Sequence, residues 1–369
     1  MKKIWVVIVI IVIAVLVIFT VITRNKKEIE DIKIGAILPL TGAAANHGKD
    51  AKDGIIMAID EINNNGGLKN RQVRVIFEDN TSTKNGSISS VQKLIHFDKV
   101  PLILGPISSS NVLAVAPITE DSKTVLFTPT ASSLKISQAG NYVFRNSLLA
   151  APQAQKMADF CIHVLKQTTV AILYINDDTG HGYYESFKKA FESLGGKVIF
   201  IDTYNKEDTD FRTQITKLKN SRAKCVYVPA IPQTMGYIIR QTVELGYHPI
   251  FIGNIGIEGE DLLTIAGRFA ENVFYTSVPV STQFAKKYET LFGKKPRIAA
   301  PLAYDATKIA AIAITKGGYN SLGIKNALYE IRNYKGATGI VRFFNADGDA
   351  EREIIIKTIK NGEFVPVKQ

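Results

Sequence analysis

The sequence is poor in the residues that build metal, redox and nucleotide sites. It has two cysteines, one tryptophan and five scattered histidines among 369 residues, and it contains no H-E-x-x-H or C-x-x-C motif. A P-loop, a glycine-rich dinucleotide fingerprint and a G-x-S-x-G elbow are also missing. We therefore predict no metal, no cofactor and no catalytic residue.

A basic block with interleaved aromatics is missing as well, although the formal net charge is +11. The lysines are spread along the chain, which argues against nucleic acid as a partner. A basic surface is compatible with an anionic lipid surface nearby.

The two cysteines, Cys161 and Cys225, both lie inside apolar runs. This placement predicts two buried thiols in one domain. Their spacing does not decide whether they form a disulfide.

The N-terminus carries the one long hydrophobic run, the uncharged segment from Ile4 to Ile22. As a helix rising ~1.5 Å per residue it would span roughly 28 Å, close to a bilayer core. No A-x-A cleavage site is visible, and the first cysteine comes too late for a lipoprotein signal. We predict that 1–29 is an uncleaved membrane anchor or, as the alternative, a cleaved signal, and that residues from about 30 onward lie outside the cytoplasm.

Past residue 30, short β-rich runs alternate with amphipathic helical stretches. Strands are expected at Ile32–Leu38, Val73–Phe77, Leu102–Leu104, Val125–Phe127, Val170–Ile175, Val198–Ile201, Val226–Val228, Ile250–Ile252 and Val273–Ser277. Helices are expected at Lys49–Asn64, Lys84–Phe97, Asn111–Glu120, Gln153–Lys166, Tyr183–Leu194, Phe211–Lys219, Met235–Leu245, Thr282–Phe292, Tyr304–Thr315 and Leu322–Ile331, before β-like runs at Ile340–Phe344 and Arg352–Ile359. This alternation, occurring in two sets, predicts an α/β fold with two doubly wound lobes around parallel sheets.

Ligands of such sheets bind beyond the carboxyl ends of the strands. One strand-end loop, Gly105–Asn111, is rich in serine and opens a helix. Unpaired N–H groups at a helix start favour an anion, although Ser109 or Ser110 could simply cap the helix. Thr130 and Ser132, two residues apart after the next strand, could face the same ligand group.

At these residues the chain resembles the branched-chain amino-acid-binding family of periplasmic binding proteins, the substrate receptors of ABC importers. The resemblance covers roughly Ile32 to Val367. It is carried by Ile34–Gly42, by Ala58–Asn63 with Gly66-Gly67, by the Gly105-Pro106 loop with its serines, by Thr128–Ser132 and by Tyr304-Asp305-Ala306.

The resemblance implies three chain crossovers at a hinge between the lobes. The N-terminal lobe would comprise 30–147 plus 280–340, and the C-terminal lobe 148–279 plus 341–369. Ser109, Thr130 and Ser132 would hold the ligand's carboxylate together with backbone N–H groups. His47 and His181 stand where relatives often place aromatic side chains that wall the site.

The sequence departs from the family at the position that pairs with a ligand ammonium. Relatives that bind amino acids usually carry an acidic residue there, and the matched residue is Ile255. An aromatic of the family is likewise replaced by Ile231. The ligand is therefore either an amino acid, with a charge restored by Asp177, Asp178, Glu258 or Glu260, or a carboxylate without an α-ammonium.

The sequence thus favours reversible ligand capture by lobe closure and delivery to an ABC permease and its ATPase. The alternative is a membrane-tethered ligand sensor that acts through a separate partner. An enzyme is a third possibility, for which no nucleophile–base set is visible.

Overall fold

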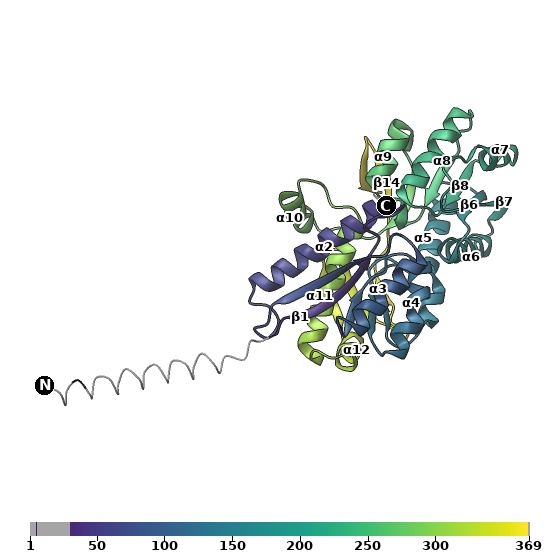
Figure 1. Cartoon of the computed structure of the whole chain (residues 1–369). Helices are drawn as coiled ribbons and strands as arrows, with labels where there is room; N and C mark the ends of the chain where they lie inside the picture. Colours follow the sequence, from purple (N-terminus) through teal and green to yellow (C-terminus); the bar gives the residue numbers. More distant parts are fainter. Residues whose placement is uncertain (1–4, 6–29, 368–369) are drawn as a thin grey trace.

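The computed structural model describes Trp5 and residues 30–367 (Figure 1). The segment expected to anchor the chain in a membrane lies outside the described residues, apart from Trp5. No helix within the described residues is long and apolar enough to cross a membrane.

The first lobe is built on a five-stranded parallel sheet in the order β2-β1-β3-β4-β5. Its strands are β1 (Ile32–Leu38), β2 (Val73–Asp79), β3 (Leu102–Leu104), β4 (Val125–Thr128) and β5 (Val143–Arg145). Alternate side chains of β1 enter the cores on opposite faces of the sheet, with Ala36 and Leu38 on one face and Ile37 on the other. Both faces are thus buried, as expected for a parallel sheet between helices.

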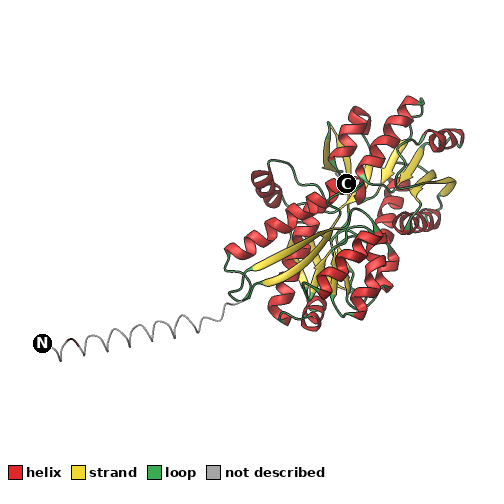
Figure 2. Ribbon diagram, viewed as in Figure 1, coloured by secondary structure: helices red, strands yellow, loops and turns green. Residues whose placement is uncertain are grey.

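Helices cover both faces of this sheet (Figure 2). They are α2 (Ala45–Asn64), α3 (Lys84–His96), α4 (Ser109–Asp121), α11 (Ala299–Gly317) and α12 (Ser321–Tyr329), with a 3-10 turn, η1, at Leu134–Gln138. Helix α10 (Thr282–Phe292) packs against α2 and α11 in a separate small cluster. Helices α2 and α11 approach closely at Gly54, where an added Cβ would lie 2.1 Å from the Ala300 carbonyl oxygen. Alanine at position 54 would therefore push these two helices apart.

The second lobe repeats this architecture with a seven-stranded sheet in the order β15-β14-β10-β9-β8-β6-β7. Its strands are β6 (Thr169–Ile175), β7 (Lys197–Tyr204), β8 (Cys225–Val228), β9 (Ile250–Gly253), β10 (Phe274–Ser277), β14 (Ile355–Lys360) and β15 (Glu363–Pro366). The strands β6 to β10 are parallel, and β14 and β15 extend the sheet antiparallel. The doubly wound order of β1 to β5 recurs in β6 to β10, which confirms the predicted α/β class with parallel sheets.

The helices of the second lobe pack in two layers around its sheet. They are α5 (Ala150–His163), α6 (Asp178–Ser193), α7 (Arg212–Asn220), α8 (Pro232–Glu244) and α9 (Glu260–Ala266), with 3-10 turns at η2 (Ile255–Ile257) and η3 (Gly267–Ala270). Helices α5 and α6 lie on one face, and α7, α8 and α9 on the other. The two predicted buried thiols, Cys161 on α5 and Cys225 on β8, are fully buried, with their sulfur atoms 3.8 Å apart and unbonded.

A third, small antiparallel sheet changes the predicted lobe boundary. It comprises β11 (Arg332–Gly336), β12 (Gly339–Phe344) and β13 (Ala350–Arg352). Val341, Phe344 and Ala350 belong to the core of the first lobe. The assignment of 341–369 to the second lobe was therefore wrong for residues up to 352, because these apolar side chains are buried against α12 and the first sheet.

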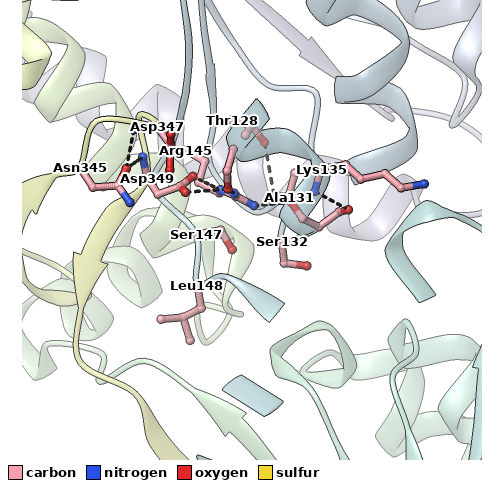
Figure 3. A network of polar contacts seen from close by, with 12 residues as sticks. Thr128, Ala131, Ser132, Lys135, Arg145, Ser147, Leu148, Asn345, Asp347 and Asp349 are labelled. Atoms are coloured by element: carbon pink, nitrogen blue, oxygen red, sulfur yellow. Dashed lines mark hydrogen bonds and ion pairs between the residues drawn. The ribbon is translucent and has the colours of Figure 1, made fainter. Parts of the chain in front are cut away.

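Arg145, at the end of β5, fixes this small sheet to the first lobe (Figure 3). Its guanidinium is fully buried and pairs with Asp349, and its Nη1 donates to the Ser133 carbonyl oxygen at 2.7 Å. Asp349 also accepts a hydrogen bond from Ser137 at 2.8 Å. One buried charge therefore joins β5, the turn before β13 and the loop that carries Ser132.

The chain passes between the lobes three times, as the resemblance implied. The crossings lie between β5 and α5, between β10 and α10, and between β13 and β14. Leu148 and Val278, on two of these crossings, are buried in a small apolar cluster with Ile255, Ile298 and Leu302. Ile354 of the third crossing packs against the same cluster. Three chain crossings around one small apolar cluster are suited to a hinge.

We expect Asp349→Ala to lower the free energy of unfolding by about 3–5 kcal/mol, because it leaves the Arg145 charge buried without its partner. Chemical denaturation of the full-length chain measures this. The control, Asp347→Ala, removes an exposed carboxylate two residues away and should change stability by less than about 0.5 kcal/mol. Equal effects of the two substitutions would contradict the role given to Arg145.

Candidate functional site

A cavity of about 530 Å³ lies between the two lobes. It is bounded by the loops that follow β1, β3 and β4 in the first lobe and β6, β8 and β9 in the second. Six of the seven predicted site residues line it, namely Ser109, Thr130, Ser132, His47, Ile231 and Ile255. The volume suits a small organic ligand.

Five helices of the described residues begin at this cavity without a side-chain cap. They are α2, α4, α8, α9 and α11, and their N-cap residues, which line the cavity and accept no N–H bond through their side chains, are Ala44, Ser108, Ile231, Gly259 and Ile298. Helices α3 and α6, in contrast, are capped by Thr83 and Asp177. Uncapped helix starts concentrate partial positive charge, so the cavity favours an anion.

Helix α4 provides the clearest case. Among the described residues, the backbone N–H groups of Ser109, Ser110 and Asn111 have no hydrogen-bond acceptor, although all three residues are buried. The chain reaches this helix through Gly105, whose φ of +91° only glycine adopts readily. Buried N–H groups without a partner are rare, and an anion in the cavity would supply the acceptor.

The Ser109 hydroxyl joins the two first-lobe loops. Its oxygen accepts the N–H groups of Ser132 at 3.2 Å and Ser133 at 3.1 Å. Because these bonds occupy both lone pairs, the hydroxyl proton remains available for donation to a ligand oxygen. Ser109 is thus both a structural residue and a candidate donor.

Thr130 and Ser132 differ in how their hydroxyls are used. The Thr130 hydroxyl donates to the Ile107 carbonyl oxygen at 2.8 Å, so it holds the loop after β3 rather than an open position in the cavity. Figure 3 shows the Ser132 side chain directed away from the Arg145 network. Of this predicted pair, Ser132 is therefore the better candidate for ligand contact.

His47 lies in the first turn of α2, beside the buried Asp50 and Arg297. Burial lowers the pKa of His47 below its ordinary value of 6.5, the Asp50 carboxylate opposes this, and the Arg297 guanidinium adds to it. His47 is therefore mainly neutral at pH 7 and adds a hydrogen-bonding ring rather than a charge.

His181, the seventh predicted residue, does not line the cavity. Its ring packs edge-on against Tyr174, with centroids 5.2 Å apart. On α6, residues 179 and 183 share a face because a helix turns about 100° per residue, and Thr179 and Tyr183 do line the cavity. The aromatic wall expected from His181 is supplied by Tyr183.

Part of the cavity wall is apolar. Ile255, Ile298 and Leu302 line the cavity and belong to the hinge cluster. The Ile255 N–H donates to Gln153 Oε1 at 3.3 Å, and Gln153 Nε2 donates to the Tyr183 hydroxyl at 2.8 Å. The cavity wall thus combines polar, hydrogen-bonding groups with aliphatic side chains.

The lobes contact each other around the cavity. Asn46 Nδ2 lies 3.0 Å from both carboxylate oxygens of Asp261, and Lys135 Nζ lies 2.8 Å from Asp178. Lys135 holds the pKa of the Asp178 carboxyl below its usual range. The structure is therefore that of a closed pair of lobes.

Arg297 was missed by the sequence analysis. It lines the cavity, lies 2.9 Å from Asp50 and reaches Glu260 of the second lobe at 3.4 Å. It sits between α10 and α11, away from any strand end, so no local pattern indicated it. Within the described residues, no group of three or more His, Cys, Asp or Glu side chains could hold a metal ion.

The chain belongs to the periplasmic binding protein family, whose model matches residues 31–363. The resemblance to the branched-chain amino-acid-binding proteins is thereby confirmed. Family members are solute-binding components of transporters, so the chain is a binding protein rather than an enzyme.

Similar proteins agree with this assignment. Leu/Ile/Val-binding protein homolog 3 of Brucella melitensis is 25% identical over 321 residues, which cover 85% of this chain and 87% of that protein. A leucine-binding protein from Thermotoga maritima superimposes with a TM-score of 0.86 at 26% identity, covering 91% of this chain and 98% of its own. The substrate-binding protein of a branched-chain amino acid transporter from Streptococcus pneumoniae, in complex with isoleucine, gives a TM-score of 0.85 at 27% identity and coverages of 92% and 100%.

We expect Ser109→Ala to lower the free energy of unfolding by about 1–3 kcal/mol, because two buried N–H groups lose their acceptor. The control is Ser89→Ala on α3, where the serine is exposed and makes no side-chain hydrogen bond in the structure. Urea denaturation of both variants measures the difference. A Ser109 variant as stable as the Ser89 variant would show that the hydroxyl does not join the loops.

The lowered pKa of His47 predicts a pH dependence of stability. The unfolded chain takes up a proton near the ordinary pKa, whereas the folded chain resists it, so stability is full above 6.5 and falls as the pH drops below it. Between about pH 7.5 and 5.5, His47→Gln should lose less thermal stability than the wild type. His248→Gln, at an exposed site, should behave like the wild type. A His47 variant that loses as much thermal stability as the wild type over this pH range would contradict the lowered pKa of His47.

Proposed function

We propose that this chain is the extracellular substrate-binding protein of an ABC importer. It captures a small carboxylate, either an amino acid or a related acid, by closure of its lobes. The observation that carries this proposal is the interlobe cavity, onto which the uncapped starts of α2, α4 and α8 open, with Ser109 and Ser132 in its lining. The similarity to the Streptococcus pneumoniae protein that holds isoleucine supports a ligand of this size with a carboxylate group.

Capture proceeds in two steps in this proposal. The ligand carboxylate first docks on the first lobe, where it accepts the free N–H groups at the start of α4 and the hydroxyl protons of Ser109 and Ser132. The second lobe then closes over the aliphatic part of the ligand with Ile231 and Ile255.

Closure has to be driven by contacts that exist only in the closed state, because a ligand with equal affinity for both states shifts nothing. The Asn46–Asp261 and Lys135–Asp178 contacts between the lobes are of this kind. Exposed ion pairs each contribute little, so contacts of the ligand with both lobes have to supply most of the driving force.

The closed form would then dock on a membrane permease, which an ATPase drives. We propose that residues 1–29 tether the lobes to the outer face of the cell membrane. A tether raises the local concentration of the binding protein at the permease and removes the need for free diffusion.

Isothermal titration of the full-length chain with small carboxylates tests this proposal. We expect Ser132→Ala to weaken the binding of whichever acid binds the wild type by about 1–2 kcal/mol, because the ligand loses one hydroxyl donor. Ser89→Ala should bind like the wild type. Small-angle X-ray scattering should show the lobes closing when the acid is added. Unchanged affinity in the Ser132 variant, or no closure on binding, would contradict the proposal.

A further inference from the structure

The cavity wall contains carboxylates, but the buried ones are already paired with cations of this chain. Asp50 is 2% exposed and lies 2.9 Å from Arg297 and 3.1 Å from Lys294. Lys294 also lies 2.8 Å from Asp53 and Arg297 lies 3.4 Å from Glu260, so the two cations are shared among three carboxylates. A ligand ammonium at Asp50 would compete with two resident cations.

Glu258 is the other buried carboxylate on the cavity wall, at 4% exposure. Both of its oxygens lie 3.0 Å from Lys357 Nζ, and Oε2 also accepts hydrogen bonds from Tyr275 and Ser277. Lys357 is itself 6% exposed, so the two form a buried neutral pair. Glu258 therefore presents little net charge to the cavity.

Asp177 pairs with no cation in a salt bridge among the described residues, and it is the carboxylate best placed to bind a ligand ammonium. One of its oxygens accepts the Gly180 N–H at 2.9 Å, and the other accepts the Ser110 hydroxyl at 3.4 Å, across the gap between the lobes. As the N-cap of α6 it balances the positive end of that helix. Its charge is thus already used to cap a helix and to contact the other lobe.

The remaining acids, Glu207, Glu260 and Asp261, lie at the edge of the cavity. Glu207 and Glu260 are exposed, and Asp261 is held by Asn46. Solvent screens exposed charges, so they select weakly for a buried ammonium.

We infer that the cavity selects carboxylates that carry no α-ammonium, namely branched or aromatic carboxylic and oxo acids, and that Ile255 enforces this choice. The inference rests on the proposed function and specifies its substrate class. The starts of α2, α4 and α8 attract the carboxylate, whereas the side chains of Ile255, Ile298 and Leu302 offer an ammonium neither charge nor acceptor. An ammonium buried there would be uncompensated, which is unfavourable.

Two matched ligand pairs test the inference on the wild-type full-length chain by isothermal titration. Isocaproate is leucine without its ammonium, and hydrocinnamate is phenylalanine without its ammonium. In whichever pair binds, we expect the acid to bind at least about tenfold more tightly than the amino acid. An amino acid that binds as tightly as its partner, or more tightly, overturns the inference but leaves carboxylate capture intact. Binding of none of the four compounds overturns the proposed function itself, and the inference with it.

The role of Ile255 is tested with Ile255→Glu and its uncharged isostere, Ile255→Gln. The Glu variant should shift the leucine-to-isocaproate affinity ratio toward leucine by at least about tenfold, because it places a carboxylate beside the amino group. The Gln variant should leave the ratio near that of the wild type. Equal shifts in both variants would remove Ile255 as the determinant. If the Glu variant does not fold, the wild-type ligand series still decides the inference.

Discussion

The residues at the start of α4 line the gap between the two lobes, and their peptide N–H groups have no acceptor among the described residues. A buried N–H group without a partner is unfavourable, and an anion in the closed cavity would supply the acceptor. The Ser109 hydroxyl, at the same turn, accepts hydrogen bonds from the N–H groups of Ser132 and Ser133, and its proton remains free to be donated. The helix start and this hydroxyl thus point to the same ligand chemistry.

The loop that faces α4 is held from behind by a buried ion pair. Arg145 binds the Ser133 carbonyl on one side and Asp349 on the other, some two hundred residues later in the chain. The same pair secures the small sheet from which the chain makes its third crossing (Figure 3). One buried charge in the first lobe therefore anchors both the loop that carries Ser132 and the small sheet that precedes the third crossing.

Much of this arrangement could be predicted from the sequence, because parallel strands bring their carboxyl ends to one edge. The alternation of β-rich and helical segments predicted β1, β3 and β4. It thereby predicted the loops after β3 and β4, which carry Ser109 and Ser132. No pattern in the sequence indicates β5, which is three residues long and ends in the buried Arg145. The run expected at Arg352–Ile359 is in fact split between β13 and β14, since the chain changes lobes there without a change in composition.

The directions of individual side chains could not be predicted from the sequence either. His181 matched a wall position of the family, but the helical phase of α6 turns it toward Tyr174 and leaves Tyr183 at the cavity. Arg297 enters from a loop that follows no strand, so only the packing of α11 against α2 brings it to the site. The compensation of Glu258 by Lys357 joins positions 99 residues apart and could not be inferred locally.

The most direct test of a carboxylate-binding cavity is the chemical identity of the molecule that occupies it. Native mass spectrometry of the full-length chain, purified without added ligand from the cells that make it, followed by identification of the released compound, tests this directly. The account predicts a small organic acid bound one to one through its carboxylate. A bound sugar, polyamine or other compound without an acidic group would contradict it.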